Sequence, residues 1–224
     1  MNKPLFEPFP KMARLSRACT ITEKIDGTNA QIIIRTKDEI DATNTAFGRL
    51  IAMVDGFAIF AGSRTRLVTL ADDNHGFSRW VLDHAGSLIQ LGVGRHFGEW
   101  WGSGINRGYG LPKGKMRFSL FNTNRWSENS PEFVGTKWDD VSRMETPVYT
   151  EACPSCCHVV PVLYRGIFHS DAVEDCMQDL RLNGSAAAKG FMNPEGVVVH
   201  HTAAGVGFKI TLQNDEGPKG SSHN

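Results

Sequence analysis

Apolar and polar residues alternate over several short segments of the chain, and this period of two residues predicts β-strands. The segments with this alternation, or with a run of β-branched residues, are 31–35, 57–60, 117–122, 159–163, 196–200 and 205–211. Two longer segments repeat their apolar residues every three to four positions, which predicts helices at 73–91 and 170–183. Strands spread along the chain around two helices predict an α+β fold.

The segment that organises the chain is Thr22–Asn29, in which a strand reaches Lys24 and then meets a tight turn at Asp26-Gly27. A second strand follows, so we expect a hairpin that holds Lys24 at the mouth of a sheet. A lysine fixed in this way can act as a nucleophile once its amine has lost its proton, and burial or a nearby cation favours that loss. A surface lysine beside a hairpin turn is the alternative.

Two glutamates further along the chain lie next to glycines. Glu99 follows Phe97-Gly98, where a glycine lets the backbone approach a ligand and an acceptor-only carboxylate suits ribose hydroxyl groups. Glu195 precedes Gly196 at the start of a β-branched strand, and a carboxylate there can bind magnesium through water, because hard cations choose oxygen. The alternatives are an exposed strand glutamate and a turn glutamate.

Aromatic and basic residues in other strands offer further contacts. Phe118 and Phe121 are three positions apart, so one can lie in the core while the other covers a flat base. Arg64 and Arg66 are predicted to share one side of a strand and to bind phosphate or ribose, unless they are salt-bridged on an edge strand. A buried Lys209 in the last strand would meet a phosphate oxygen as a point charge.

The 224 residues suit one domain or slightly more, and 41% of them are apolar, which is enough for a sizeable core. The formal net charge is zero, so no strong field attracts a polyanion, although a local basic groove could exist. No apolar run reaches the ~20 residues that span a membrane. The N-terminus lacks a signal-peptide core, so we expect a cytoplasmic protein whose five cysteines are reduced thiols.

The segment 123–157 is rich in Asn, Ser, Pro and charged residues, and we interpret it as an insertion with short turns and one or two edge strands. It ends in a cluster of three cysteines and the histidine that follows them. A zinc ion could bind there if His169 or Cys176 completed the ligand set, and otherwise the cluster is a surface loop. The residues of this cluster are Cys153, Cys156, Cys157 and His158.

The segment Lys24-Ile25-Asp26-Gly27-Thr28-Asn29 resembles motif I of the covalent nucleotidyltransferases, the superfamily of polynucleotide ligases and mRNA capping enzymes. Asn29 stands where capping enzymes and most DNA ligases carry arginine, so the chain looks most like the ATP-dependent RNA ligases of the phage and RNA-editing type. Many of those relatives carry a second lysine beside the one at Lys209, and this chain does not. The other segments that resemble motifs of the family, in the family's order, lie around Arg64, Glu99, Phe121, Glu195 and Lys209.

The resemblance implies a nucleotidyltransferase fold of the ligase adenylation type over residues 1–212, with twisted, mainly antiparallel sheets around an ATP cleft and flanking helices. Residues 213–224 are expected to form a flexible tail. Relatives often add a separate C-terminal domain that grips nucleic acid, and we expect none here. A helper protein could then assist in binding RNA, while the oligomeric state is not predicted.

The resemblance also implies a three-step reaction in RNA repair. Lys24 attacks the α-phosphate of ATP and forms lysyl-AMP, AMP passes to an RNA 5′-phosphate, and a 3′-hydroxyl then displaces AMP and joins the strands. The cofactors are ATP and magnesium, with manganese as a substitute, and Glu195 would order the metal-bound water.

The remaining roles implied by the resemblance concern the nucleotide. Glu99 would hold the ribose, Phe121 the adenine, with Phe118 as runner-up, and Lys209 the α-phosphate. Further nucleotide contacts are expected from Glu23, Asn29 and Arg64, and Asp26 could buttress the turn or act in catalysis.

Three other functions fit the same pattern. A DNA ligase shares the chemistry, a capping guanylyltransferase would use GTP, and a nucleotide-binding module could have lost ligation altogether. For an RNA ligase, the sealed ends could belong to a duplex nick, a single-stranded break or a tRNA loop.

Overall fold

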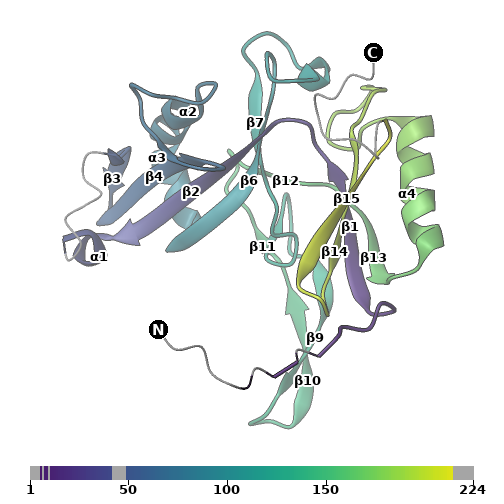
Figure 1. Ribbon diagram of the computed structural model, residues 1–224. Helices are drawn as coiled ribbons and strands as arrows, with labels where there is room; N and C mark the ends of the chain where they lie inside the picture. Colours follow the sequence, from purple (N-terminus) through teal and green to yellow (C-terminus); the bar gives the residue numbers. More distant parts are fainter. Residues whose placement is uncertain (1–5, 7, 10, 42–48, 214–224) are drawn as a thin grey trace.

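The computed structural model describes residues 6, 8, 9, 11–41 and 49–213, and in this part the chain forms two main β-sheets (Figure 1). The strand order of the large sheet is β12-β7-β6-β2-β4-β3, with β5 on β4, and that of the small sheet is β13-β1-β14-β15. The large sheet consists of β2 (Thr28–Thr36), β3 (Ala52–Val54), β4 (Phe57–Ser63), β5 (Leu67–Val68), β6 (Gly94–Gly102), β7 (Met116–Leu120) and β12 (His158–Val159). The small sheet consists of β1 (Ala18–Lys24), β13 (Val162–Ile167), β14 (Gly196–His201) and β15 (Val206–Thr211).

The predicted α+β class with mainly antiparallel sheets is confirmed. Among the described strand pairs, only β7 with β12 and β8 with β11 are parallel. The remaining helices and strands are α1 (Lys37–Asp41), α2 (Phe77–Asp83), α3 (Ala85–Leu88), the 3-10 turns η2 (Ile89–Leu91) and η3 (Gly108–Gly110), β8 (Trp126–Ser127), β9 (Phe133–Asp139), β10 (Met144–Tyr149), β11 (Glu151–Ala152) and α4 (Ser170–Asn183). None of the helices in the described ranges is long and apolar enough to cross a membrane.

Each sheet buries one face against helices. Ile32 and Ile34 of β2 alternate onto the face that packs with α2 and α3, and they belong to the largest hydrophobic cluster. In the small sheet, Ile21, Val197 and Val199 pack against the apolar side of α4. Because strand residues alternate between the two faces, Lys24 of β1 and Asn29 of β2 lie on the faces turned away from these helices.

The predicted hairpin at the Asp26-Gly27 turn is wrong, because β1 and β2 belong to different sheets. Strand β1 pairs with β13 and β14, whereas β2 pairs with β4 and β6. The crossing brings the backbone so close to β6 that a Cβ on Gly27 would lie 2.4 Å from the carbonyl oxygen of Trp100. Glycine is needed there for this approach, and the turn places the residues that flank it at the junction of the two sheets.

The predicted helix at 73–91 is divided in the structure. His84 has a φ of −113°, which ends α2, and its ring nitrogen Nδ1 lies 2.8 Å from the carbonyl oxygen of Trp80. The apolar residues Phe77, Val81 and Leu88 still lie in the core. The spacing of three to four residues therefore predicted the buried side correctly, although the helix is broken. The second predicted helix is confirmed as α4.

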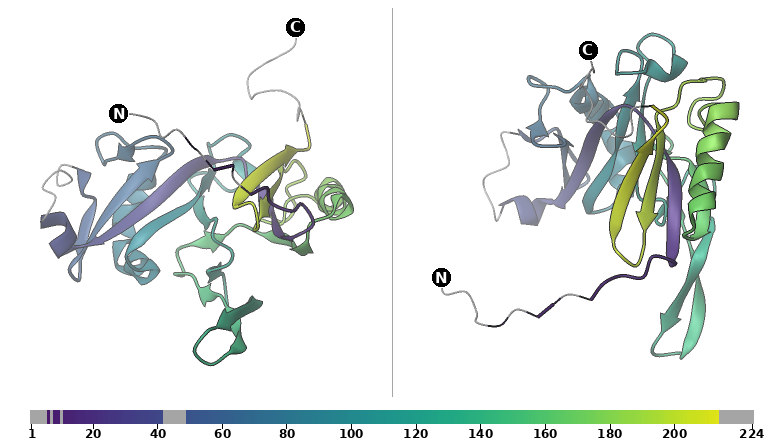
Figure 2. Two further views of the ribbon diagram at one scale, coloured as in Figure 1. Left: turned by 60° about the horizontal axis from the view of Figure 1, so that its bottom comes forward. Right: turned by 45° about the vertical axis from the view of Figure 1, so that its right-hand side comes forward.

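The segment 123–157 contains β8 to β11, and the β9–β10 hairpin projects from the rest of the fold (Figure 2). The expected edge strands are therefore present, and the interpretation as an insertion stays a prediction. Within the described residues, no three His, Cys, Asp or Glu side chains are placed together to hold a metal ion, which gives the zinc interpretation no support. Cys153 and Cys157 instead pack in the large core, and His158 contacts Glu128. Of the predicted tail, residues 214–224 lie outside the described part.

Candidate active site

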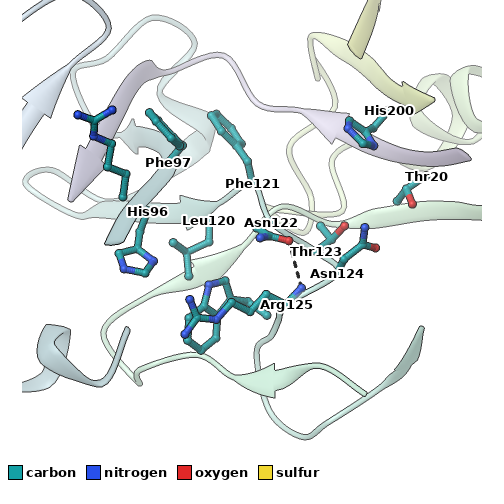
Figure 3. A pocket seen from close by; sticks show the side chains of 12 residues that line it. Thr20, His96, Phe97, Leu120, Phe121, Asn122, Thr123, Asn124, Arg125 and His200 are labelled. Atoms are coloured by element: carbon teal, nitrogen blue, oxygen red, sulfur yellow. Dashed lines mark hydrogen bonds between the residues drawn. The ribbon is translucent and has the colours of Figure 1, made fainter. Parts of the chain in front are cut away.

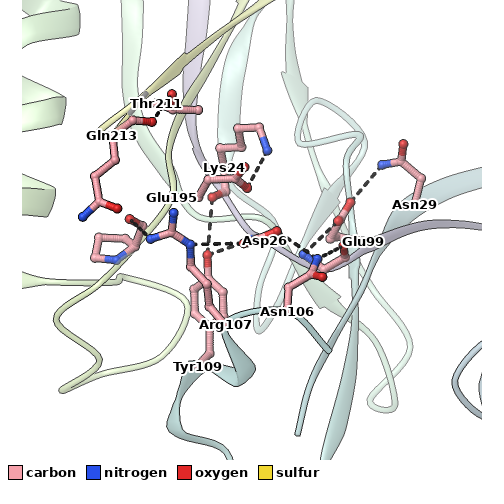
Figure 4. A network of polar contacts seen from close by, with 12 residues as sticks. Lys24, Asp26, Asn29, Glu99, Asn106, Arg107, Tyr109, Glu195, Thr211 and Gln213 are labelled. Atoms are coloured by element: carbon pink, nitrogen blue, oxygen red, sulfur yellow. Dashed lines mark hydrogen bonds and ion pairs between the residues drawn. The ribbon is translucent and has the colours of Figure 1, made fainter. Parts of the chain in front are cut away.

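Lys24 is the last residue of β1 and lies at the junction of the two sheets. Its Nζ is 2.5 Å from Oε2 of Glu195, and the two side chains are 20% and 2% exposed (Figure 4). The register explains the contact, because Lys24 pairs with Gly196 at the start of β14 and Glu195 is the preceding residue. The two predicted catalytic residues therefore form a largely buried ion pair.

Glu99 lies on β6 of the large sheet, where it is paired with Asn29 of β2. Its carboxylate accepts hydrogen bonds from the backbone N–H of Gly27 at 3.0 Å and from Nδ2 of Asn29 at 2.9 Å. Burial raises the pKa of Glu99 to about 7, against the effect of these two hydrogen bonds and of the Lys24 charge. Glu195 raises it further by repulsion, so Glu99, Lys24 and Glu195 interact electrostatically.

Asn29 connects this site to Arg64, whose Nε donates to Oδ1 of Asn29 at 2.9 Å. Both predicted nucleotide ligands are therefore held together beside Glu99. The predicted pairing of Arg64 with Arg66 on one side of a strand is wrong, since β4 ends at Ser63 and Arg66 turns away to Asp72.

Asp26 is a buried residue of the turn itself, and it is bound by three residues that were not selected from the sequence. Its Oδ1 accepts from Nδ2 of Asn106 at 2.9 Å, and its Oδ2 accepts from Nε of Arg107 at 3.1 Å. Its backbone N–H donates to the hydroxyl of Tyr109 at 2.9 Å. The available signal was the glycine-rich run at 102–110, which places Asn106-Arg107 directly after the Glu99 strand.

Glu23 does not fit its predicted role as a nucleotide contact, because its side chain points to the opposite face of β1 from Lys24 and is 1% exposed. The carboxylate accepts from Oγ of Ser185 at 2.6 Å and from the backbone N–H of Ala187 at 2.9 Å. Burial raises the pKa of Glu23 above its ordinary value. The residue anchors the loop between α4 and β14.

A cavity of about 470 Å³ opens between the two sheets and is lined by Thr20 and His200 from the small sheet, by Phe97 from β6 of the large sheet, and by Phe121, the residue after β7 (Figure 3). Phe121 is 41% exposed, whereas Phe118 is fully buried in the core. Of the two phenylalanines considered for a flat base, only Phe121 is therefore accessible to a ligand.

Lys209 is exposed, which corrects the expectation of a buried lysine. The register pairs it with Val198, which in turn pairs with Thr22 of β1. Thr22 and Lys24 are two positions apart, so Lys209 lies on the same face of the small sheet as Lys24.

Magnesium fits the carboxylates at this site as a partly hydrated ion. Glu99 and Glu195 are hard oxygen donors, and Mg²⁺ in proteins commonly uses one or two carboxylates together with water and substrate phosphates.

The site combines a partly buried lysine, two carboxylates and an accessible aromatic face, a set of groups that suits transfer of a nucleotide to an amine. The family model described as RNA ligase matches residues 17–211. The chain belongs to the RNA ligase family. The match includes every residue from Glu23 to Lys209 that the sequence analysis selected for the reaction.

Solved structures similar to this RNA ligase family member include two lysine-to-alanine variants of Naegleria gruberi RNA ligase, one without ligand and one with ATP and Mn. Both are 16% identical, with TM-scores of 0.43 and 0.44, over 93% of this chain and 57% of the other. The chain thus spans a little over half the length of these structures. Among curated proteins, none matches the sequence significantly.

Proposed function

We propose that the protein is an ATP-dependent RNA ligase whose nucleophile is Lys24. The observation that carries the proposal is the position of this amine, which belongs to a side chain that is 20% exposed at the end of β1 and is paired with Glu195 where the two sheets meet. Membership of the RNA ligase family supplies the substrate class.

In the first step the neutral amine of Lys24 attacks the α-phosphorus of ATP, a P–N bond forms, and pyrophosphate leaves with the broken P–O bond. The ion pair with Glu195 orients the Lys24 amine before the reaction, and the carboxylate can accept the proton of the amine. Magnesium held by Glu195 through water would supply positive charge to the phosphates and to the surroundings of Lys24, which favours the neutral amine.

The nucleotide is held by residues of both sheets. The base occupies the cavity against the exposed face of Phe121, and the ribose hydroxyl groups donate to Glu99. Arg64 and Asn29 provide donors toward the phosphates, and Lys209 provides a positive charge on the face of the small sheet that carries Lys24.

Two further transfers complete ligation. The 5′-phosphate of an RNA strand attacks the lysyl-AMP, which returns Lys24 to its amine and leaves AMP joined to the RNA through a pyrophosphate bond. A 3′-hydroxyl then attacks the RNA phosphorus of that bond, and AMP leaves as the phosphodiester forms. Each step replaces one phosphate bond by another, which divides a difficult displacement into easier ones.

The test is incubation of the protein with magnesium and ATP labelled at either the α- or the γ-phosphate. Wild type is expected to retain only the α-label, Lys24→Ala to retain none, and Lys113→Ala, which changes an exposed lysine, to behave as wild type. Label on Lys24→Ala would overturn the proposal, as would labelling by GTP alone.

A panel of nicked duplex RNA, single-stranded RNA, a broken tRNA loop and nicked DNA then defines the ends that are joined. Joining of RNA ends supports the proposal. Joining of DNA alone, or labelling without any joined product, would replace it by a DNA ligase or by a module that has lost ligation.

A further inference from the structure

A short loop after β6 reaches across the junction between the two sheets. We call residues 103–110 the clasp loop, because two buried residues hold it while those between them face the site. Ile105 is 3% exposed in the core of the large sheet, and Tyr109 is 2% exposed in a separate cluster with Ile25 and Trp101. The clasp loop is therefore fixed by packing.

Arg107 of the clasp loop joins the segment of Lys24 to the segment of Glu195 (Figure 4). Its Nε donates to Oδ2 of Asp26 at 3.1 Å, and its Nη1 donates to the carbonyl oxygens of Asn193 at 3.0 Å and Pro194 at 3.2 Å. These acceptors lie two residues after Lys24 and one or two residues before Glu195. The guanidinium thus holds both segments at the distance that the ion pair requires.

The neighbours of Arg107 hold the same turn from other directions. Nδ2 of Asn106 donates to Oδ1 of Asp26 at 2.9 Å and to the carbonyl oxygen of Gly27 at 2.6 Å. The hydroxyl of Tyr109 accepts from the backbone N–H of Asp26 and donates to the carbonyl oxygen of Lys24 at 3.4 Å. The backbone on both sides of Lys24's neighbour Ile25 is therefore fixed by side chains of the clasp loop.

The backbone of the clasp loop is strained. Asn106 has a φ of 44° and Tyr109 a φ of 50°, which places both in the left-handed region that residues with a Cβ seldom adopt. Such strain persists where the surrounding structure determines it and is concentrated at functional sites. The geometry of the clasp loop is thus set by the contacts that it makes with the turn.

We propose that Arg107 is a positioning residue, which keeps the amine of Lys24 and the carboxylate of Glu195 aligned for formation of lysyl-AMP. The proposal rests on the proposed function for its kinetic test. Arg107 is not among the residues that line the base cavity, and its hydrogen bonds reach the segments of Lys24 and Glu195, so we expect it to act through these two segments and to leave nucleotide affinity to other residues. Lysine cannot replace it, because an ammonium is a point donor that lacks the planar fork.

The kinetic test measures single-turnover formation of lysyl-AMP in Arg107→Ala and Arg107→Lys over a range of ATP concentrations. A misplacement of about 1 Å can cost about 100-fold in rate, so we expect a loss of that order in the maximal rate of Arg107→Ala, with the half-saturating ATP concentration unchanged. Guanidinium ion at a concentration that does not unfold the protein should restore part of the rate, whereas sodium at equal ionic strength should not.

The matched control is Arg181→Ala, which removes an exposed arginine paired with Glu174 on α4 and should keep the wild-type rate. Arg107→Lys keeps the positive charge beside Asp26, so it provides a folded variant if Arg107→Ala does not fold. A wild-type maximal rate per folded molecule in Arg107→Lys, or a loss that appears only as weaker ATP binding, overturns the proposal.

A second readout does not depend on ligase activity. Brief acetylation by an anhydride, followed by mass spectrometry, reports how freely the Lys24 amine reacts, with the exposed Lys113 as internal reference. We expect Lys24 to react several-fold faster relative to Lys113 in the Arg107 variants than in wild type. If wild type forms no lysyl-AMP but this ratio rises, the proposed function fails and the positioning role stands; an unchanged ratio overturns the positioning role.

Discussion

Nζ of Lys24 lies 2.5 Å from Oε2 of Glu195, although 171 positions separate the two residues in the sequence. Antiparallel pairing of β1 with β14 brings them together, and the crossing of the chain into β2 brings Glu99 to the same place. The site is therefore a property of the junction between two sheets. Its stability and its reactivity should respond to the same few residues.

The ion pair itself can be tested by unfolding. Glu195→Gln keeps the shape of the side chain and removes its charge, and hydrogen bonds to charged groups contribute about 1.5–3 kcal/mol, so we expect the free energy of unfolding to fall by about 2 kcal/mol. Lys24→Met should cost a similar amount or more, because it leaves the buried carboxylate without the ammonium.

Urea denaturation of both single variants and of the double variant measures the coupling. The double variant should lose less than the two single variants combined, since neither charge then remains without its partner. Glu174→Gln, which breaks an exposed pair, should change stability by less than about 0.5 kcal/mol. Additive losses at Lys24 and Glu195 would show that the pair does not stabilise the junction.

The raised pKa of Glu99 predicts how the free energy of unfolding should change with pH. The folded state keeps the proton of Glu99 up to a pKa of about 7, whereas the unfolded chain loses it near the ordinary value of 4.5. The free energy of unfolding should therefore fall as pH rises from about 5 to about 7, by about 3 kcal/mol for this group. Denaturation curves across that range should be flatter for Glu99→Gln, and parallel curves for the two proteins would contradict the shifted pKa.

The accessible phenylalanine should affect ATP binding without much effect on folding. Stacking of a base on an aromatic side chain contributes about 1–3 kcal/mol, so Phe121→Ala should raise the half-saturating ATP concentration about tenfold or more. Phe208→Ala removes another exposed phenylalanine, from the face of the small sheet that carries Val199, and should leave the half-saturating ATP concentration unchanged. Phe118→Ala should instead cost about 3–5 kcal/mol of stability, because that ring is fully buried.

The close approach at Gly27 predicts a large effect of a single methyl group. A Cβ there would lie 2.4 Å from the backbone oxygen of Trp100 and 2.7 Å from Cβ of Trp101. Overpacking typically costs about 1–3 kcal/mol, so we expect Gly27→Ala to lower the free energy of unfolding by at least about that much. Gly86→Ala is the matched control, because nothing lies within 4 Å of its added Cβ. Thermal unfolding should show a large loss for the first and none for the second.

Sequence reasoning was most successful where the signal is local. The run of β-branched residues predicted the strand that begins directly after Glu195, and the apolar period together with Asn183-Gly184 predicted the extent of α4. The strand that carries Glu99 was not among the segments predicted from alternation. Phe118 and Phe121 were correctly expected to differ in burial, because their spacing of three is out of phase with a strand.

The predictions that failed concern contacts between residues that are far apart in the sequence. An Asp-Gly turn between two strands is compatible with a hairpin, and only the contact of Gly27 with Trp100 shows that the second strand joins another sheet. The glycine-rich run at 102–110 indicates a turn at Arg107 but not its partners, since its acceptors Asp26 and Asn193 lie far away on opposite sides of it in the sequence. Its importance appears only once the two sheets are assembled.

The central claim is that the amine of Lys24 carries AMP. The most direct measurement is peptide mapping by mass spectrometry of the protein after incubation with ATP and magnesium. The conditions must preserve the phosphoramidate bond between the lysine nitrogen and AMP. The account predicts one added AMP on the peptide that contains Lys24 and its release when RNA with a 5′-phosphate is supplied. AMP on any other residue, or an unmodified Lys24 peptide in fully folded protein, would contradict it.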